Sequence, residues 1–199
     1  RDDLLDGSNT MAGLFGTLNV AAYMVGTFAV AWMASRVTLV GLIRIGMVLS
    51  TSALGLAAIA PNGPTLAIAL TVMGLGGALI WIPSPAIAAR TLPPHRAGMA
   101  VGLVGSGIGV GVVFAGQMAR YLDQRSDGDQ VWQTLYRIEF GIAVVVLIGV
   151  FVFLRSHGDR PSATGGFGGF TALKTVPGWI PATVAYAAFG FAYILVIGF

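Results

Sequence analysis

Residues 66–120 read LAIALTVMGLGGALIWIPSPAIAARTLPPHRAGMAVGLVGSGIGVGVVFAGQMAR. The stretch holds two apolar runs without a charged residue, 66–89 and 97–119, on either side of a short basic segment at 90–96. Each run is longer than the roughly 20 residues with which an α-helix crosses the hydrocarbon core of a bilayer. Because Lys and Arg in short loops stay in the cytoplasm, the stretch predicts a transmembrane hairpin with a cytoplasmic turn.

The composition of the whole chain is typical of an integral membrane protein. Of 199 residues, 56% are hydrophobic and only 10% are charged, whereas soluble domains carry about 25% charged residues. A soluble core of this size could not bury so much apolar surface. The small net charge of +3 and the lack of a basic stripe argue against nucleic-acid binding. The sequence contains no cysteine, which excludes a disulfide framework, a thiol nucleophile and a thiolate metal site.

Further apolar runs extend the hairpin to an all-α, polytopic bundle with about six transmembrane helices. The predicted spans are residues 10–34, 40–60, 65–89, 97–119, 138–154 and 177–199. The longest loop carries Gly-Gly-Phe-Gly-Gly at 165–169, and its composition predicts a flexible linker at 156–176. This linker divides the chain into an amino-terminal part, 1–155, and a final helix, 177–199.

The distribution of charge predicts how the bundle is oriented. Seven basic residues belong to the loops 35–39, 90–96 and 155–176 or to the adjoining helix ends: Arg36, Arg44, Arg90, Arg96, Arg155, Arg160 and Lys174. The opposite side, with a predicted external loop at 121–137, has four basic residues and every acidic residue except Asp159. We therefore expect the three loops to be cytoplasmic in a multi-pass protein of the cell membrane.

Polar residues and prolines within the spans are candidates for function. Asn19 and Tyr23 lie four residues apart on one helical face, where they either line a central cavity or hydrogen-bond to a neighbouring helix. Pro83 and Pro85 interrupt the hydrogen bonding of the third span, so the bend there is either structural or a moving gate. Glu139 falls at the predicted outer edge of its span, which favours a solvated surface group over a functional carboxylate within the membrane.

The span at 97–119 is crowded with glycine at intervals of four residues. The pairs are Gly98/Gly102, Gly105/Gly109 and Gly107/Gly111. This spacing predicts close packing between membrane helices. A nucleotide-binding G-x-G-x-x-G motif is excluded, because its last glycine is missing in every frame and no strand precedes it. The G-x-S-x-G motif of nucleophilic serines is also absent around Ser106.

Two stretches carry a resemblance to a known family. Residues 13–26 read GLFGTLNVAAYMVG and residues 102–111 read GLVGSGIGVG. Together with the external start, the basic turns and the long linker, they make the chain similar to transporters of the major facilitator superfamily, and within it to the YbfB/YjiJ-like branch. The resemblance implies two six-helix halves. Residues 1–155 would be the first half without its first helix, and 177–199 would be the first helix of the second half.

The chain departs from the family in three places, one of which is the Gly-Pro pair in the fifth helix of drug/proton antiporters, whose glycines are present here without the proline. The signature between the family's second and third helices is preserved only in part: Ser35 stands where the family has an acidic residue, while Arg36 and Arg44 form a basic remnant. Leu70, four residues before Gly74, stands where proton-linked members often carry Arg. These departures give no support to drug/proton antiport.

The resemblance implies a secondary active transporter that moves a small organic solute across the cytoplasmic membrane by alternating access. Candidates for the lining of its substrate cavity are Asn19, Tyr23, Trp81, Ser84, Ser106 and Gln117. The expected partners are the bilayer, a small-molecule substrate and a coupling ion such as a proton, with no metal and no cofactor. A small accessory or structural membrane protein is the alternative. An intramembrane enzyme is disfavoured, because His95 and His157 both fall in loops.

Overall fold

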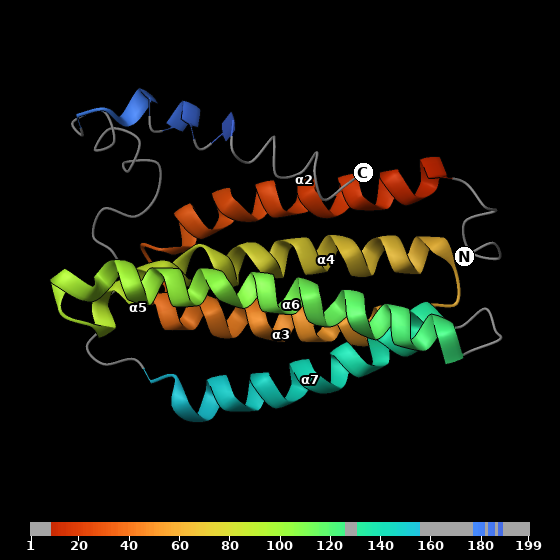
Figure 1. Ribbon diagram of the computed structural model, residues 1–199. Helices are drawn as coiled ribbons and strands as arrows, with labels where there is room; N and C mark the ends of the chain where they lie inside the picture. The colour runs from red at the N-terminus through yellow and green to blue at the C-terminus, as the bar shows by residue number, and fades with distance from the viewer. Residues whose placement is uncertain (1–8, 126–130, 156–176, 182, 186, 189–199) are drawn as a thin grey trace.

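The computed structural model describes residues 9–125, 131–155, 177–181, 183–185, 187 and 188. Within these residues all regular structure is helical, and Figure 1 shows long helices packed alongside one another as a bundle. The helices are α2 (Asn9–Met33), α3 (Leu39–Ala58), α4 (Gly63–Trp81), α5 (Pro83–Thr91), α6 (Ala97–Arg125) and α7 (Val131–Phe153), with a short 3-10 helix, η1, at Pro94–Arg96.

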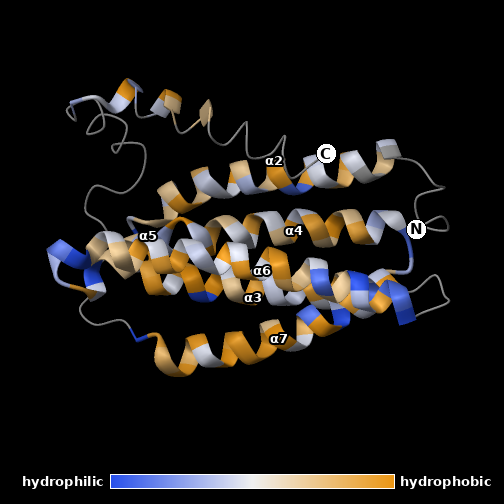
Figure 2. Ribbon diagram, in the orientation of Figure 1, coloured by the Kyte–Doolittle hydropathy of each residue, from blue (hydrophilic) through white to orange (hydrophobic). Residues whose placement is uncertain are grey.

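Five of the described helical segments are long and apolar enough to cross a membrane. They are Gly13–Met33, Leu39–Ala58, Gly63–Thr91, Pro94–Arg125 and Val131–Phe153. Figure 2 shows that hydrophilic residues gather toward the two ends of the bundle, while the middle of each helix is largely hydrophobic. The predicted helix bundle is therefore confirmed for its first five spans. The linker at 156–176 and most of the predicted span at 177–199 lie outside the described residues.

Side-chain caps fix where α3 and α4 begin. The Thr38 hydroxyl accepts a hydrogen bond from the Gly41 amide at 3.0 Å, and the Asn62 side-chain oxygen accepts one from the Thr65 amide at 3.0 Å. Both capping residues have an extended backbone, as N-cap residues do. The cap at Asn62 ends a tight reversal at 59–62, so α3 and α4 run antiparallel as neighbours.

Helix α4 packs along both α2 and α3, and glycines bring the backbones close together. A Cβ atom added to Gly74 of α4 would collide with the backbone oxygen of Asn19 in α2. A Cβ atom added to Gly46 of α3 would lie 2.7 Å from the backbone oxygen of Gly76 in α4. Both separations are too short for a real side chain, so the contacts of α4 with its two neighbours depend on glycine.

The third span is broken at Pro83, between α4 and α5. The Ile82 amide still donates to the Ala78 carbonyl at 3.2 Å, but Pro83 has no N–H with which to continue the series. The Ser84 hydroxyl donates to the Ile80 carbonyl at 2.5 Å and so satisfies a backbone group beside the break. The interruption predicted from the two prolines is therefore present, and both pieces belong to one apolar segment, Gly63–Thr91.

The external loop predicted at 121–137 is mostly helical, which corrects the sequence-based boundaries. Helix α6 continues to Arg125, and α7 already begins at Val131. Trp132 and Tyr136 explain the early start of α7, because their rings meet edge to face at 6.2 Å and both pack on a buried apolar cluster. The cluster consists of Phe15, Ala57, Ala60, Leu66 and Ala69. Contacts with this cluster stabilise a helical turn that the polar sequence did not predict.

The close packing predicted for the α6 glycines is not found within the described residues. Cβ atoms added at the paired positions would have nothing within 4 Å of them: Gly98, Gly102, Gly105, Gly107, Gly109 and Gly111. Helix α6 packs mainly on α5, and α7 packs mainly on α3, so both helices leave much of their surface exposed. The glycine contacts that hold the described bundle together belong to α2, α3 and α4 instead.

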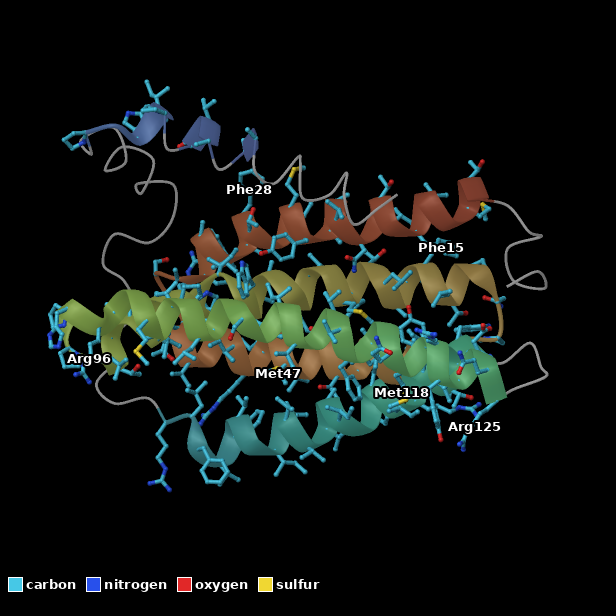
Figure 3. All side chains as sticks on the ribbon, viewed as in Figure 1. Phe15, Phe28, Met47, Arg96, Met118 and Arg125 are labelled. Carbon is cyan, nitrogen blue, oxygen red and sulfur yellow. The ribbon has the colours of Figure 1, made fainter. Side chains whose placement is uncertain are left out.

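Alternate turns lie at the same end of the bundle. Figure 1 shows the turn at 34–38, η1 and the last residues of α7 at one end, and the turn at 59–62 at the other. In Figure 3, Arg96 and Arg125 mark the two opposite ends of α6. The loops predicted at 35–39 and 90–96 therefore lie on one side of the bundle.

Candidate functional site

Two of the six predicted cavity residues lie where α2 packs on α4. The Asn19 amide group donates to the Leu70 carbonyl at 2.7 Å. The interhelical hydrogen bond that the sequence offered as the alternative role of this residue is therefore present. The ring of Tyr23 faces Gly77, where an added Cβ would lie 3.6 Å from the ring. Both side chains are half-buried, and both hold α2 against α4.

The other four predicted cavity residues lie elsewhere. Trp81 and Ser84 flank the break between α4 and α5, and both are half-buried. On the exposed surface of α6, the Ser106 hydroxyl donates to the Leu103 carbonyl of its own helix at 2.7 Å, and Gln117 is exposed. The six residues thus occupy three places: the α2/α4 contact, the proline break and the surface of α6. None of them lines the cavity between α3, α6 and α7.

Ser35 and Arg36 fold back onto the last turn of α2. The Ser35 hydroxyl donates to the Trp32 carbonyl at 3.1 Å. The Arg36 guanidinium lies over the indole of Trp32, 4.0 Å from the ring centroid, which is favourable cation–π geometry. Both side chains are exposed. Their contacts with described residues are to Trp32, near the end of the same helix.

Arg44 reaches from α3 to the end of α7. Its Nη2 atom donates to the Leu154 carbonyl at 2.9 Å, and its guanidinium lies 5.2 Å from the centroid of the Phe151 ring. A positive charge at the carboxyl end of a helix is stabilised by the helix dipole and by the free carbonyl groups there. Arg44 therefore ties α3 and α7 together at the end of the bundle that we expect to be cytoplasmic.

A cavity of about 360 Å³ lies between α3, α6 and α7. It is lined by Met47, Ser50, Thr51 and Leu54 of α3, by Gly111, Phe114 and Ala115 of α6, and by Glu139, Ile142, Ala143 and Val146 of α7. Figure 3 shows Met47 well away from both ends of the bundle. Although Ser50, Thr51 and Glu139 are among these residues, the exposed wall is almost wholly apolar. The sequence did not predict that these segments meet.

Glu139 is the only charged side chain among the residues that line the cavity. Because α7 begins at Val131, Glu139 lies about 12 Å along the helix, at 1.5 Å per residue, rather than at its edge. Its side chain is half-buried, and the interpretation of Glu139 as a solvated surface group stays a prediction. The less favoured alternative, a functional carboxylate within the membrane span, also stays a prediction.

Glu139 is half-buried, and the exposed wall of the cavity is almost wholly apolar, so the residue lines it mainly with its aliphatic part. No hydrogen bond or ion pair joins Glu139 to another of the described residues. The same part of the chain contains no group of three or more His, Cys, Asp or Glu side chains that could hold a metal ion. A single carboxylate beside apolar walls is able to accept a proton or to pair with a cation.

Comparison with known proteins gives one clear match. The sequence profile of the Major Facilitator Superfamily matches residues 3–199, which is nearly the whole chain. No curated protein matches the chain. The family match agrees with the five apolar helical spans and with the all-helical fold of the described residues. The chain therefore belongs to the Major Facilitator Superfamily.

Proposed function

We propose that the chain forms part of a secondary active transporter that moves a small organic solute across the cytoplasmic membrane by alternating access. The observation that carries this proposal is the family match over residues 3–199, because members of the family are transporters of small molecules. In such transporters, two halves rock around a site near the middle of the bilayer. The YbfB/YjiJ-like branch is part of the same proposal and rests on the stretches 13–26 and 102–111.

The domain organisation is also a proposal. Residues 1–155 are one half without its first helix, 156–176 are a cytoplasmic linker, and 177–199 open the second half. The packing supports this reading, because α4 lies between α2 and α3, and the inverted repeats nested in such a half call for an equivalent helix between α6 and α7. The uncovered glycines of α6 leave room for that helix to approach closely.

The proposed orientation places loops 35–39, 90–96 and 155–176 in the cytoplasm. The excess of basic residues at that end supports it. In a cysteine-free form of the full-length protein, His95→Cys should react with a membrane-impermeant maleimide only after the cells are permeabilised, and Asp123→Cys should react in intact cells. Both side chains are exposed at their ends of the bundle. The reverse labelling pattern would show that the orientation is inverted.

The roles of the polar candidates in a central cavity remain part of the proposal. Ser106 and Gln117 are exposed on α6. They can line a central cavity only if the second half of the transporter covers this surface. Ser106→Ala and Gln117→Ala should then lower the transport rate while leaving the amount of folded protein in the membrane unchanged. The same comparison applies to the remaining candidates, Asn19, Tyr23, Trp81 and Ser84.

Transport is tested with the full-length protein in proteoliposomes. Three radiolabelled probes of different charge cover the main solute classes: choline, benzoate and glucose. We expect one of them to accumulate when a proton or sodium gradient is imposed, and the accumulation to disappear when an ionophore collapses the gradient. If a monodisperse protein moves none of the probes faster than protein-free liposomes do, the accessory or structural alternative is favoured.

A further inference from the structure

One end of the bundle carries exposed basic side chains. Arg36 lies in the turn that follows α2. Between α5 and α6, the segment around η1 carries three more, which we call the basic turn: Arg90, His95 and Arg96. Figure 2 shows this turn as hydrophilic, and Figure 3 shows Arg96 at this end of the bundle. Because all four side chains are exposed rather than enclosed, a partner outside the bundle can reach them.

The positive charge at this end is not balanced by acidic residues. The two acidic side chains that the structure describes, Asp123 and Glu139, both lie toward the opposite end. Residues 120–139 at that end contain three arginines and four acidic residues, whereas the basic turn contains two arginines and no acidic residue. The segment 156–176 has two basic residues and one acidic residue, so it does not neutralise the basic turn. Five described arginines belong to the basic end: Arg36, Arg44, Arg90, Arg96 and Arg155.

Exposed aromatic side chains mark where this end meets the membrane surface. Trp32, in the last turn of α2, is 54% exposed, and Arg36 lies over its ring, 4.0 Å from the centroid. Phe153, the last residue of α7, is 84% exposed, and the exposed Arg155 follows it closely. Tryptophan is typical of the boundary between hydrocarbon and headgroups. Figure 1 shows η1 at the same end of the bundle, so the basic turn lies near the level of the lipid headgroups.

We propose that this end of the protein binds anionic phospholipid, with the phosphate of one headgroup held at the basic turn. Clusters of about four to eight basic residues beside membrane helices attract anionic headgroups, and five arginines lie at this end. The guanidinium groups of Arg90 and Arg96 offer a planar fork of donors that matches phosphate oxygens. A bilayer lipid fits better than a free anion, because the aromatic side chains hold this end at the membrane surface.

The test is a lipid titration of the full-length protein in a neutral detergent, with bound lipids counted by native mass spectrometry. Dioleoylphosphatidylglycerol is the anionic probe, and dioleoylphosphatidylcholine, which has the same acyl chains and no net charge, is the reference. We expect the first phosphatidylglycerol to bind at least about tenfold more tightly than the first phosphatidylcholine, because each arginine near the headgroup contributes on the order of fivefold. Arg96→Gln should lower this preference about fivefold, and Arg90→Gln/Arg96→Gln should nearly abolish it.

Matched variants keep the result interpretable. Arg96→Lys retains the charge and should keep most of the preference, which distinguishes loss of charge from misfolding. Arg120→Gln/Arg125→Gln removes two exposed arginines at the opposite end of α6 and should bind both lipids as the wild type does. Added sodium chloride should weaken the binding of phosphatidylglycerol and leave that of phosphatidylcholine unchanged, because salt screens exposed charges. Sodium phosphate at the same ionic strength should have no larger effect.

Several results would overturn the proposal. They are equal affinity of the wild type for the two lipids, an unchanged preference in Arg90→Gln/Arg96→Gln, and an equal loss in Arg120→Gln/Arg125→Gln. Displacement of phosphatidylglycerol by phosphate beyond the effect of ionic strength would assign the basic turn to a free anion instead. A preference that is absent in the wild type and present in Asp159→Asn would assign the turn to the segment 156–176.

The outcome for the lipid site is separable from the outcomes for orientation and transport. Both ends of the protein are accessible in detergent, so lipid binding does not depend on which end faces the cytoplasm. A lipid preference without flux in the proteoliposomes would uphold the lipid site and refute the transporter. Flux by a wild-type protein that binds the two lipids equally would uphold the transporter and refute the lipid site.

Discussion

Gly74→Ala should disrupt the contact between α2 and α4. The new Cβ would meet the Asn19 backbone oxygen and would lie 3.1 Å from the Cβ of Ala22. Neither atom can rotate away, because the oxygen belongs to the backbone and the Cβ of Ala22 is bonded directly to the Cα of its own residue. Helix α2 therefore has to move. Overpacking of this kind costs about 1–3 kcal/mol. The movement also strains the Asn19–Leu70 hydrogen bond, and such bonds between membrane helices contribute about 0.6 kcal/mol, with a maximum near 1.7. We expect a total loss of about 2–4 kcal/mol.

The measurement is the free energy of unfolding of the full-length protein, titrated with SDS in mixed micelles and followed by circular dichroism. Gly77→Ala is the matched control on the same helix, since its Cβ would lie at an ordinary 3.6 Å from the Tyr23 ring. This control should stay within about 0.5 kcal/mol of the wild type. The reasoning is refuted if Gly74→Ala is as stable as the wild type, or if Gly77→Ala loses as much as Gly74→Ala does.

Three further substitutions test individual contacts. Asn19→Leu removes the donor to the Leu70 carbonyl and should lower the free energy of unfolding by about 0.6–1.7 kcal/mol in the same titration; no change would mean that the bond contributes nothing. Arg44→Ala should speed amide hydrogen exchange in the last turn of α7 near Leu154, and Arg44→Lys should restore protection only in part, because lysine lacks the planar fork of donors. Asn62→Ala should cost about 0.5–2 kcal/mol through the lost cap of α4, while Asn62→Asp, which also caps, should remain close to the wild type.

The transmembrane helices were predictable because each depends on a local property, the length of an apolar run between charged or turn-forming residues. The predicted spans 40–60 and 97–119 begin within one residue of α3 and α6. The start of α7 was not predictable in this way. Charge places the boundary after Arg137, but the helix extends back to Val131 because Trp132 and Tyr136 pack on residues of other helices. That contact depends on the tertiary structure and leaves no local signal.

The glycines show that a local sequence pattern does not predict which helices pack closely together. The four-residue spacing on α6 is the stronger local pattern, yet the close contacts between described helices involve Gly26, Gly46, Gly74 and Gly76 on α2, α3 and α4. Spacing identifies which glycines share a face of a helix, but it does not say which neighbour that face meets. For the same reason the sequence identified Asn19 as an interhelical or cavity residue without identifying Leu70 as its partner.

The basic residues nearest to Glu139 lie where they do not pair with it. Asn19 already has its partner, whereas Glu139 has none among the described residues. Arg44 is bound to the Leu154 carbonyl, which lies about 22 Å along α7 from Glu139, and is therefore out of reach. Arg137 is two positions away on the same helix and so projects from a different face. Arg120 of α6 forms no ion pair with Glu139. The basic residues of the three helices thus leave Glu139 unpaired within the described part of the chain, which is tolerable for a carboxylate that is only half-buried.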